Sequence, residues 1–452
     1  MSCARKINEH SSLALNSALN IFSIPPTNAS VTRSFFREIL PLSTVSQEGP
    51  YLFRLFSDNL WTDLSRIYLH LELRIEKYSN DANAWVALEA GDTDTASIQL
   101  LGQTFIQQLV VSVGTTEVYN SGTLYPYKAY MTSELSYPKS VKESFLGSAG
   151  YYTIAAQDSL LDPGFQQQCQ RFATSKLVHL QSRLDFDLSN QELYLLNQID
   201  VLFTIYRARD AFLLHCLRAA NATRYRLYLN NIKLYAKMID VQPALNVTIH
   251  SALEKQPATY AVRKTEVKAQ FISAGRTEFD YNCFSSTIPR RVTIALIEHA
   301  AFDGSLTYSP FNFKPFRLRT LSVHAGGHIY PQIPYNLDFP NAHSTRAYVD
   351  MYEALGMANS AHSMDISQKQ FGAGWTFFVI PLTSTLDDSC GFELLRSGTT
   401  TLRLQFDAPV PAGGLEMIIL GEFDQMILEG PKPPRNYRLH AWIINNTSIC
   451  CK

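Results

Sequence analysis

Two histidines on either side of a glycine pair form the pattern closest to a metal site. His324 and His328 enclose Ala-Gly-Gly, and on a β scaffold their imidazoles could reach one cation. A zinc site needs at least one more ligand, and none stands nearby in a metal-binding pattern. The His-x-His with a following Glu that a cupin-type metalloenzyme needs is also missing. We therefore predict two loop histidines, no metal ligand and no cofactor.

Three carboxylates are of the kind that a glycosidase uses in pairs: Glu353, Asp387 and Asp388. Nothing in the sequence places Glu353 beside the other two. The patterns G-x-x-x-x-G-K-[ST], G-x-S-x-G and H-E-x-x-H do not occur. We predict no catalytic residue and no enzymatic activity, with a β-sandwich hydrolase kept as an alternative.

Basic residues form small clusters rather than one basic surface. The net charge is −1 and the pI about 6.8, so the chain lacks the basic excess of a protein that grips nucleic acid. The clusters lie on or beside predicted strands, which favours solvated faces or salt bridges between subunits and leaves only weak, local contact with DNA. They are Arg224 with Arg226, Arg263-Lys264 with Lys268, and Arg290-Arg291.

Low charge accompanies a high content of aromatic residues. Charged residues make up 17% of the chain and aromatic residues 12%. Interface cores lose charge and gain aromatic side chains, so this balance suits a protein that buries surface against other subunits. It also suits any β protein, because strands favour aromatic residues.

The cysteines indicate a reducing compartment. There are seven, an odd number at wide spacing with no C-x-x-C, which favours free thiols over disulfides or a zinc site. We interpret the adjacent Cys450 and Cys451 as part of a frayed tail. We find no secretory signal near residue 1 and no apolar run of the roughly 18 residues that a membrane helix needs.

Hydrophobic alternation with a period of two dominates the first half and puts one face on a core and the other toward water. Predicted strands of this kind cover residues 67–76, 178–187, 198–207 and 224–238. In the second strand Asp185 and Asp187 are expected on the water side. In the last, the phase flips at Asn230-Asn231, which predicts a bulge or a tight turn.

The second half repeats this pattern. Predicted strands cover residues 264–271, 290–298, 316–323, 375–381, 402–406 and 416–428. In the first of these, Val267, Ala269 and Phe271 are expected to face the core. Helical spacing is sparse and predicts three helices, near residues 124–135, from Pro243 onward, and near residues 344–356.

The organisation looks duplicated, because a helix falls roughly 90 residues into each strand-rich stretch. Two all-β modules of this size predict two tandem jelly-roll β sandwiches with short helices in their loops. The expected parts are a flexible N-terminal arm (1–30), a first jelly roll (31–241), a linker helix (242–257), a second jelly roll (258–430) and a C-terminal tail (431–452).

Five segments carry a resemblance to a known family. They are VYNSGTLYPYK (118–128), PRRVTIA (289–295), AFDGSLTYSPFNF (301–313), IYPQIPY (329–335) and YVDMYEALG (348–356). On these segments the chain resembles the double jelly-roll major capsid proteins of Polinton (Maverick) elements and the related adintoviruses. The likeness runs from about residue 31 to about residue 429 and is strongest between 289 and 356.

The resemblance implies a structural major capsid protein without catalytic residues. It implies a homotrimer that forms a pseudo-hexameric capsomer, neighbouring capsomers in an icosahedral shell, and a separate single jelly-roll penton protein. The location would be the virion capsid, assembled inside the host cell, with weak DNA contact and no membrane span. Two alternatives remain besides the hydrolase: a carbohydrate-binding or receptor-binding jelly roll, in which Trp61, Trp85 or Trp375 stacks on sugars, and a genome-resident copy that no longer builds virions.

Overall fold

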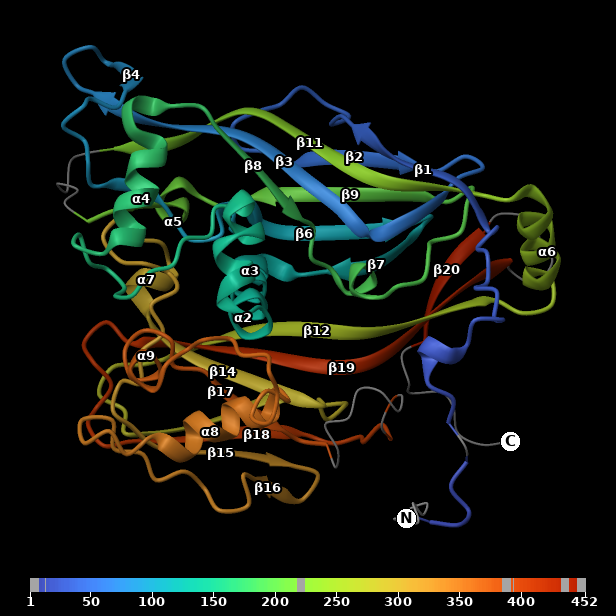
Figure 1. Ribbon diagram of the computed structural model, residues 1–452. Helices are drawn as coiled ribbons and strands as arrows, with labels where there is room; N and C mark the ends of the chain where they lie inside the picture. Colours follow the sequence, from blue (N-terminus) through green and yellow to red (C-terminus); the bar gives the residue numbers. More distant parts are fainter. Residues whose placement is uncertain are drawn as a thin grey trace.

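Strands make up most of the computed structural model (Figure 1), which describes residues 8–12, 14–217, 224–383, 392, 394–431 and 439–444. They form four large antiparallel sheets. A fifth, small sheet pairs β10 (Leu214–Cys216) with β5 (Thr95–Ser97).

The first two large sheets come from the first half of the chain. Outer sheet 1 has the order β1 (Val31–Ile39), β11 (Tyr225–Val241), β3 (Trp61–Ser79) and β8 (Val178–Arg183), and β4 (Ala84–Ala87) also pairs with β3. Inner sheet 1 has the order β2 (Tyr51–Phe56), β9 (Asp200–Arg207), β6 (Ile106–Val113) and β7 (Thr116–Asn120). Counted along the chain, the eight main strands pair as 1-8-3-6 and 2-7-4-5, which is the order of a jelly roll.

The second half repeats this order. Inner sheet 2 has the order β12 (Ala258–Ile272), β19 (Leu415–Pro431), β14 (Arg291–Glu298) and β17 (Phe378–Pro381), and β20 (Leu439–Ile444) also pairs with β19. Outer sheet 2 has the order β13 (Glu278–Phe284), β18 (Thr400–Phe406), β15 (Leu318–Ala325) and β16 (His328–Tyr330). The eight main strands again pair as 1-8-3-6 and 2-7-4-5, so the chain contains two jelly rolls in tandem.

Short helices fill the connections between strands. The α-helices are α1 (Leu101–Thr104), α2 (Tyr125–Ser136), α3 (Lys139–Glu143), α4 (Pro163–Phe172), α5 (Asp210–Leu213), α6 (Pro243–Leu253), α7 (His299–Phe302), α8 (Thr345–Ala354) and α9 (Gln368–Phe371). The 3-10 turns are η1 (Ser17–Leu19), η2 (Gly122–Leu124), η3 (Phe145–Ala149), η4 (Ala173–Ser175) and η5 (Asp187–Asn190). Helices α2 and α8 both lie in the connection between the fifth and sixth strands of their roll, which explains their equal spacing in the sequence.

The four large sheets lie in layers, with outer sheet 1 and outer sheet 2 at opposite ends of the stack (Figure 1). Alternating side chains build the core: Leu69, Leu71 and Leu73 of β3 are fully buried, and the residues between them face outward. One continuous cluster of buried apolar residues runs through both rolls. Within the described residues, no helix is long and apolar enough to cross a bilayer.

The predicted irregularity at Asn230-Asn231 is confirmed. The pairing of β11 with β3 shifts register between Leu229 and Asn231, which is a β-bulge. The extra residue turns the following side chains to the opposite face, so Ile232 and Leu234 stay in the core. The bulge also places two amide side chains on the outer face, beside Glu72.

Two expectations about side-chain direction were wrong. Asp185 and Asp187 are buried rather than exposed, because β8 ends at Arg183 and the chain turns inward toward a lysine of α2. Phe271 is 41% exposed and packs edge-on against His299, while its neighbour Ile272 is fully buried. Much of β12 is covered on both faces, so alternation could not tell which face carries the core.

Candidate functional site

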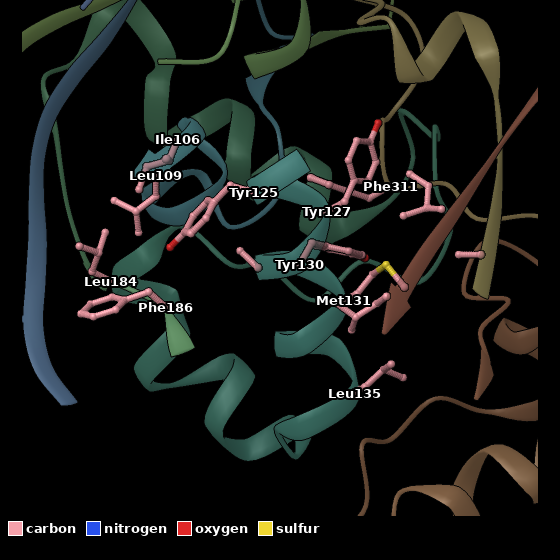
Figure 2. Close-up of a cluster of buried hydrophobic side chains, with 14 of the residues drawn as sticks. Ile106, Leu109, Tyr125, Tyr127, Tyr130, Met131, Leu135, Leu184, Phe186 and Phe311 are labelled. Carbon is pink, nitrogen blue, oxygen red and sulfur yellow. The ribbon is translucent and has the colours of Figure 1, made fainter. Parts of the chain in front are cut away.

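A layer of buried aromatic rings joins the two rolls at the seam between their inner sheets. Tyr130 of α2 stacks on Phe311 with ring centroids 4.2 Å apart and an interplanar angle of 9°. Tyr127 stacks on Phe302 at 5.4 Å and meets Phe311 edge-on at 5.9 Å. Figure 2 shows Tyr127, Tyr130 and Phe311 gathered on one side of this helix. Because these α2 rings contact rings of the second roll, the helix belongs to the cores of both rolls. Each such pair stabilises by about 0.5–1.5 kcal/mol beyond the area it buries.

A buried lysine and two aspartates cross the same seam. Lys128 Nζ of α2 lies 3.2 Å from Asp185 Oδ2 and 3.9 Å from Asp187 Oδ1. Asp187 Oδ1 also accepts hydrogen bonds from the backbone N–H and the hydroxyl of Thr265, a β12 residue of the second roll. One carboxylate therefore connects a helix of the first roll to the first strand of the second.

Burial and pairing drive the two carboxyl pKa values apart. Burial raises the pKa of Asp187 to about 6, against the opposing effects of Lys128 and Thr265. Burial acts in the same direction on Asp185, but the Lys128 ammonium and the Asn190 amide outweigh it and hold that pKa below its ordinary value. Asp187 therefore keeps its proton to a higher pH than Asp185, whose carboxylate is stabilised beside the Lys128 ammonium.

A second buried ion pair fixes the seam near α8. Lys142 Nζ of α3 donates to Glu134 Oε2 at 2.6 Å and to the carbonyl of Met364 in the second roll at 3.0 Å. The backbone N–H of Lys139 donates to Asp365 Oδ2 at 2.7 Å. Interfaces between domains are usually more polar than a domain core. This one combines a layer of aromatic rings with charges that are buried and paired. The two rolls therefore share one continuous core.

The outer face of outer sheet 1 is rich in cations that lie over aromatic rings. Phe36 on this face is 49% exposed. The pairs are Arg74 over Tyr228 (4.5 Å), Arg226 over Trp85 (4.5 Å) and Lys237 over Phe36 (4.9 Å). Aromatic residues and arginine are enriched at protein interfaces, so this face has the composition of a docking surface.

The outer face of outer sheet 2 is polar and carries both signs of charge. Arg403 Nε lies 3.7 Å from Asp280 Oδ2, and Gln405 donates to Glu278 Oε1 at 3.2 Å. Arg403 and Asp280 are both well exposed. Such loosely held pairs add little stability to the isolated chain and are free to choose other partners.

The segment before β1 exposes apolar side chains. Its only described regular element is the single turn η1, and residues 14–29 are exposed throughout. The large apolar residues on it are Leu15, Leu19, Ile21, Phe22 and Ile24. Phe22 is 90% exposed and Ile24 is 92% exposed. Apolar side chains that gather on a surface in this way often mark a site of contact with another molecule.

An open cavity of about 900 Å³ lies between loops of the two rolls. Its lining includes the basic residues Lys314, Arg317 and Lys369 together with Asn312 and Gln370. No carboxylate is among the described residues that line it. A glycosidase needs two carboxyl groups across its cleft, so this cavity gives the hydrolase alternative no support.

The basic clusters singled out in the sequence are engaged within the chain. Arg291 forms a bidentate pair with Glu422, and Arg226 pairs with Glu76 at 2.6 Å. Arg224 covers the ring of Tyr78, Arg263 pairs with Asp424, and Lys268 donates to the carbonyl of Cys283. These contacts lie within one chain, whereas the sequence favoured solvated faces or salt bridges between subunits.

The other candidate residues are not brought together into a site. His324 and His328 lie on paired strands β15 and β16, but among the described residues no third ligand joins them. Glu353 is exposed on α8, and Asp387, Asp388, Cys450 and Cys451 lie outside the described residues. Trp61 and Trp375 are buried, and Trp85 lies under Arg226, so none is free to stack on a sugar. Cys169, Cys216 and Cys283 are buried free thiols.

Comparison with known proteins supports the fold. No protein-family model matches the chain. It is 28% identical over 412 residues to the uncharacterized protein F54H12.2 of Caenorhabditis elegans, across 89% of this chain and 96% of that one.

Solved structures with the same fold come from viruses. A chain in the cryo-EM structure of the Sputnik virophage matches with a TM-score of 0.64 and 12% identity, across 98% of this chain and 95% of that one. The Faustovirus major capsid protein matches at 0.54 and 9%, across 93% of both chains. The mavirus major capsid protein matches at 0.53 and 10%, across 97% of both. The fold is thus the one expected, all-β with two tandem jelly rolls and short helices in the loops.

Proposed function

We propose that the chain is a major capsid protein, the structural subunit of an icosahedral virion shell. The observation that supports this proposal is the repeated 1-8-3-6 and 2-7-4-5 strand order in one chain, in the fold it shares with the mavirus and Faustovirus major capsid proteins. The core that the two rolls share supports it as well, because a shell subunit must present its contact faces at a constant angle. The role is structural rather than enzymatic, and its place is the virion capsid, assembled inside the host cell.

Three copies would supply six jelly rolls and form a pseudo-hexameric capsomer. Each chain has two open faces at opposite ends of its stack, one on outer sheet 1 and one on outer sheet 2 (Figure 1). Contact between outer sheet 1 of one copy and outer sheet 2 of the next is a head-to-tail interface, which closes into a trimeric ring when each copy is rotated by one third of a turn from the last. The cations on the first face would then meet the carboxylates Glu278 and Asp280 on the second.

The finer assignments rest on the sequence segments rather than on the fold. We place the chain with the Polinton, Maverick and adintovirus capsid proteins, with the division into arm (1–30), first roll (31–241), linker helix (242–257), second roll (258–430) and tail (431–452). A single jelly-roll penton protein would fill the vertices, and contact with packaged DNA would be weak. Coexpression with such a penton protein tests this assignment of the vertices: closed shells should form with the penton protein, and shells with open vertices should form without it.

The mass of the purified protein in solution is the decisive first measurement. Light scattering should give a particle of three times 51.0 kDa, and negative-stain microscopy should show a hexagonal outline or closed shells. A monomer that persists at high concentration, on changing salt and with a penton partner present would refute the proposal. Glycan screening would then test the carbohydrate-binding alternative.

A charge placed on outer sheet 1 should prevent assembly without unfolding the chain. Phe36→Glu puts a carboxylate on the proposed interface at a side chain that is 49% exposed. Phe145→Glu is the control of matched exposure, at 51%, on η3, a turn that lies outside the strands of both outer sheets. We expect monomer for the first variant and trimer for the second, by light scattering. Trimer in both would exclude this face from the interface.

The exposed apolar segment before β1 should serve shell formation rather than folding. We propose that it orders against a neighbouring copy, which would cover Phe22 and Ile24. A chain starting at Val31 should fold with an unchanged unfolding temperature but assemble poorly. Normal shells from this shortened chain would disprove the role of the segment.

A further inference from the structure

Two histidines and a glutamate converge on the outer face of outer sheet 1. His70 and Glu72 stand two residues apart on β3 and therefore point to the same side, and His179 of β8 is the direct cross-strand partner of Glu72. His70 Nε2 lies 3.8 Å from Glu72 Oε1, and His179 Nδ1 lies 3.9 Å from the same oxygen. One donor atom of each residue lies within 4.8 Å of the other two.

The glutamate is already oriented by neighbouring amides. Asn230 Nδ2 donates to Glu72 Oε2 at 2.7 Å, and Asn231 Nδ2 approaches Oε1 at 3.4 Å. Both amides are placed there by the bulge in β11. The Asn230 amide thus holds oxygen Oε2, while oxygen Oε1 faces the two imidazoles. Outer-shell hydrogen bonds of this kind hold the carboxylate ligands of metal sites in position.

The imidazole of His70 lacks the partners that a half-buried ring normally has. Its Nδ1 is buried and has no hydrogen-bond partner among the described residues. Its Nε2 is too far from Glu72 for a hydrogen bond, and the ring packs edge-on against Tyr235 at 6.1 Å. Nε2 is therefore the nitrogen of His70 that could reach a cation lying between the three donors.

We propose that His70, Glu72 and His179 bind one divalent transition-metal ion of the zinc class. Two imidazole nitrogens with one carboxylate oxygen suit zinc, whereas calcium and magnesium prefer all-oxygen sites. Bonds of about 2.0–2.2 Å in a tetrahedron place ligand atoms roughly 3.3–3.6 Å apart. Side-chain rotations must therefore bring the imidazole nitrogens in from 3.8 and 3.9 Å to Glu72 Oε1, and from at most 4.8 Å to each other. In the isolated chain His179 is the most exposed of the three.

The site goes beyond the proposed structural role, and it lies on the face that outer sheet 2 of the next copy would cover in the proposed trimer. An ion here would clamp β8 to β3, two strands that pair over only six residues. Because these residues lie on the outer face, replacing them should not disturb the apolar core beneath, and binding can be measured on the isolated full-length chain.

The test is titration of the full chain, freed of metal with a chelator, with Zn²⁺ and with Co²⁺. Calorimetry should give one high-affinity ion per chain, and Co²⁺ should develop the intense visible absorption of a tetrahedral site. His179→Gln and Glu72→Gln should each weaken binding at least about tenfold and abolish the rise in unfolding temperature that Zn²⁺ causes.

His328→Gln is the matched control, because it removes an exposed histidine from the other outer sheet. It should leave the affinity, the Co²⁺ spectrum and the Zn²⁺-induced shift unchanged. Near-UV circular dichroism of the metal-free variants confirms that each is folded. Equal Zn²⁺ affinity in wild type and His179→Gln would overturn the proposal, since the ion would then bind elsewhere. Failure of the wild type to bind would overturn it as well.

Discussion

The seam between the rolls and the outer face of outer sheet 1 hold the same kinds of side chain in opposite surroundings. Both combine cations, carboxylates and aromatic rings. At the seam, Lys128 is almost completely buried and held by two aspartates, and Tyr130 is covered by Phe311. On the outer face, Arg74 is 41% exposed and rests on Tyr228.

The difference in burial separates a region that stabilises the fold from a region that can bind other molecules. Buried charges interact strongly and cannot lose a partner without a large penalty, so the seam determines whether the chain folds. Half-exposed charges are screened by water and contribute little to stability, so the outer face is free to serve association or ion binding. Substitutions should therefore separate the two regions by the quantity that changes.

Removal of the buried lysine should have the largest effect. Lys128→Met leaves two carboxyl groups facing each other in the seam, and we expect a loss of about 3–5 kcal/mol in the free energy of unfolding. Lys176→Met removes an exposed lysine and should change stability by less than about 0.5 kcal/mol. Chemical denaturation measures both. Equal stability of the two variants would mean that Lys128 does not hold the seam.

Loss of a ring from the seam should come next. Phe311→Ala leaves a cavity beside Tyr130 and Tyr127, and we expect a loss of about 3–4 kcal/mol. Phe22→Ala, at a side chain that is 90% exposed, should leave the unfolding temperature of the isolated chain unchanged. A small effect at Phe311 would show that the aromatic layer can collapse around the gap.

The charge on Asp187 should make the seam sensitive to pH. Its folded-state pKa of about 6 lies above the ordinary value of 3.8, so its stabilising contribution is complete below about pH 4 and is lost as the pH rises through 6. Asp187→Asn keeps an oxygen for Thr265 without the charge. We expect the variant to be more stable than wild type at pH 8, on the order of 1–3 kcal/mol, with the difference disappearing near pH 4. Thermal unfolding across this range measures it, and a wild type that is more stable at pH 8 would contradict the assignment.

The smallest effect on stability should come from the outer face. Arg74→Gln removes one exposed cation from Tyr228 and from Glu76, which should cost less than about 1 kcal/mol. Its effect should instead appear as a lower fraction of trimer in light scattering. Arg346→Gln, which also removes an arginine from a tyrosine and a carboxylate, is the control and should leave assembly unchanged. A large loss of stability in the Arg74 variant would contradict the conclusion that the outer face contributes little to folding.

Alternation in the sequence predicted the longest strands, β3, β11, β12 and β19, because apolar residues alternate wherever one face of a sheet is covered. The bulge at Asn230-Asn231 was visible as a change of phase for the same reason. Alternation gave no separate range for the main strands β1, β2, β6, β7, β13 and β16. The direction of a side chain could not be predicted where alternation along the strand no longer reflects which face is buried. Phe271 belongs to a strand largely covered on both faces, and Asp187 lies just beyond the end of β8.

The candidate metal site was half visible in the sequence. His70 and Glu72 fall on the same outward face of a predicted strand, as their spacing requires. The third ligand, His179, could not be found, because only the pairing of β8 with β3 brings it opposite Glu72. The seam was invisible for a related reason: Lys128 and Thr265 stand far apart in the chain and meet only when both rolls have formed.

The pairing of each roll's first strand with its last has a consequence for how such a chain can arise. Strand β12 pairs with β19 from Ala258 opposite Glu429 to Ile272 opposite Leu415, and β1 pairs with β11 in the same manner. The chain therefore enters and leaves each roll at the same edge, side by side. A unit with adjacent entry and exit can be copied, inserted or exchanged as a whole without rethreading any other strand. Tandem duplication of one ancestral roll, followed by divergence of its surfaces, needs no intermediate with a broken sheet.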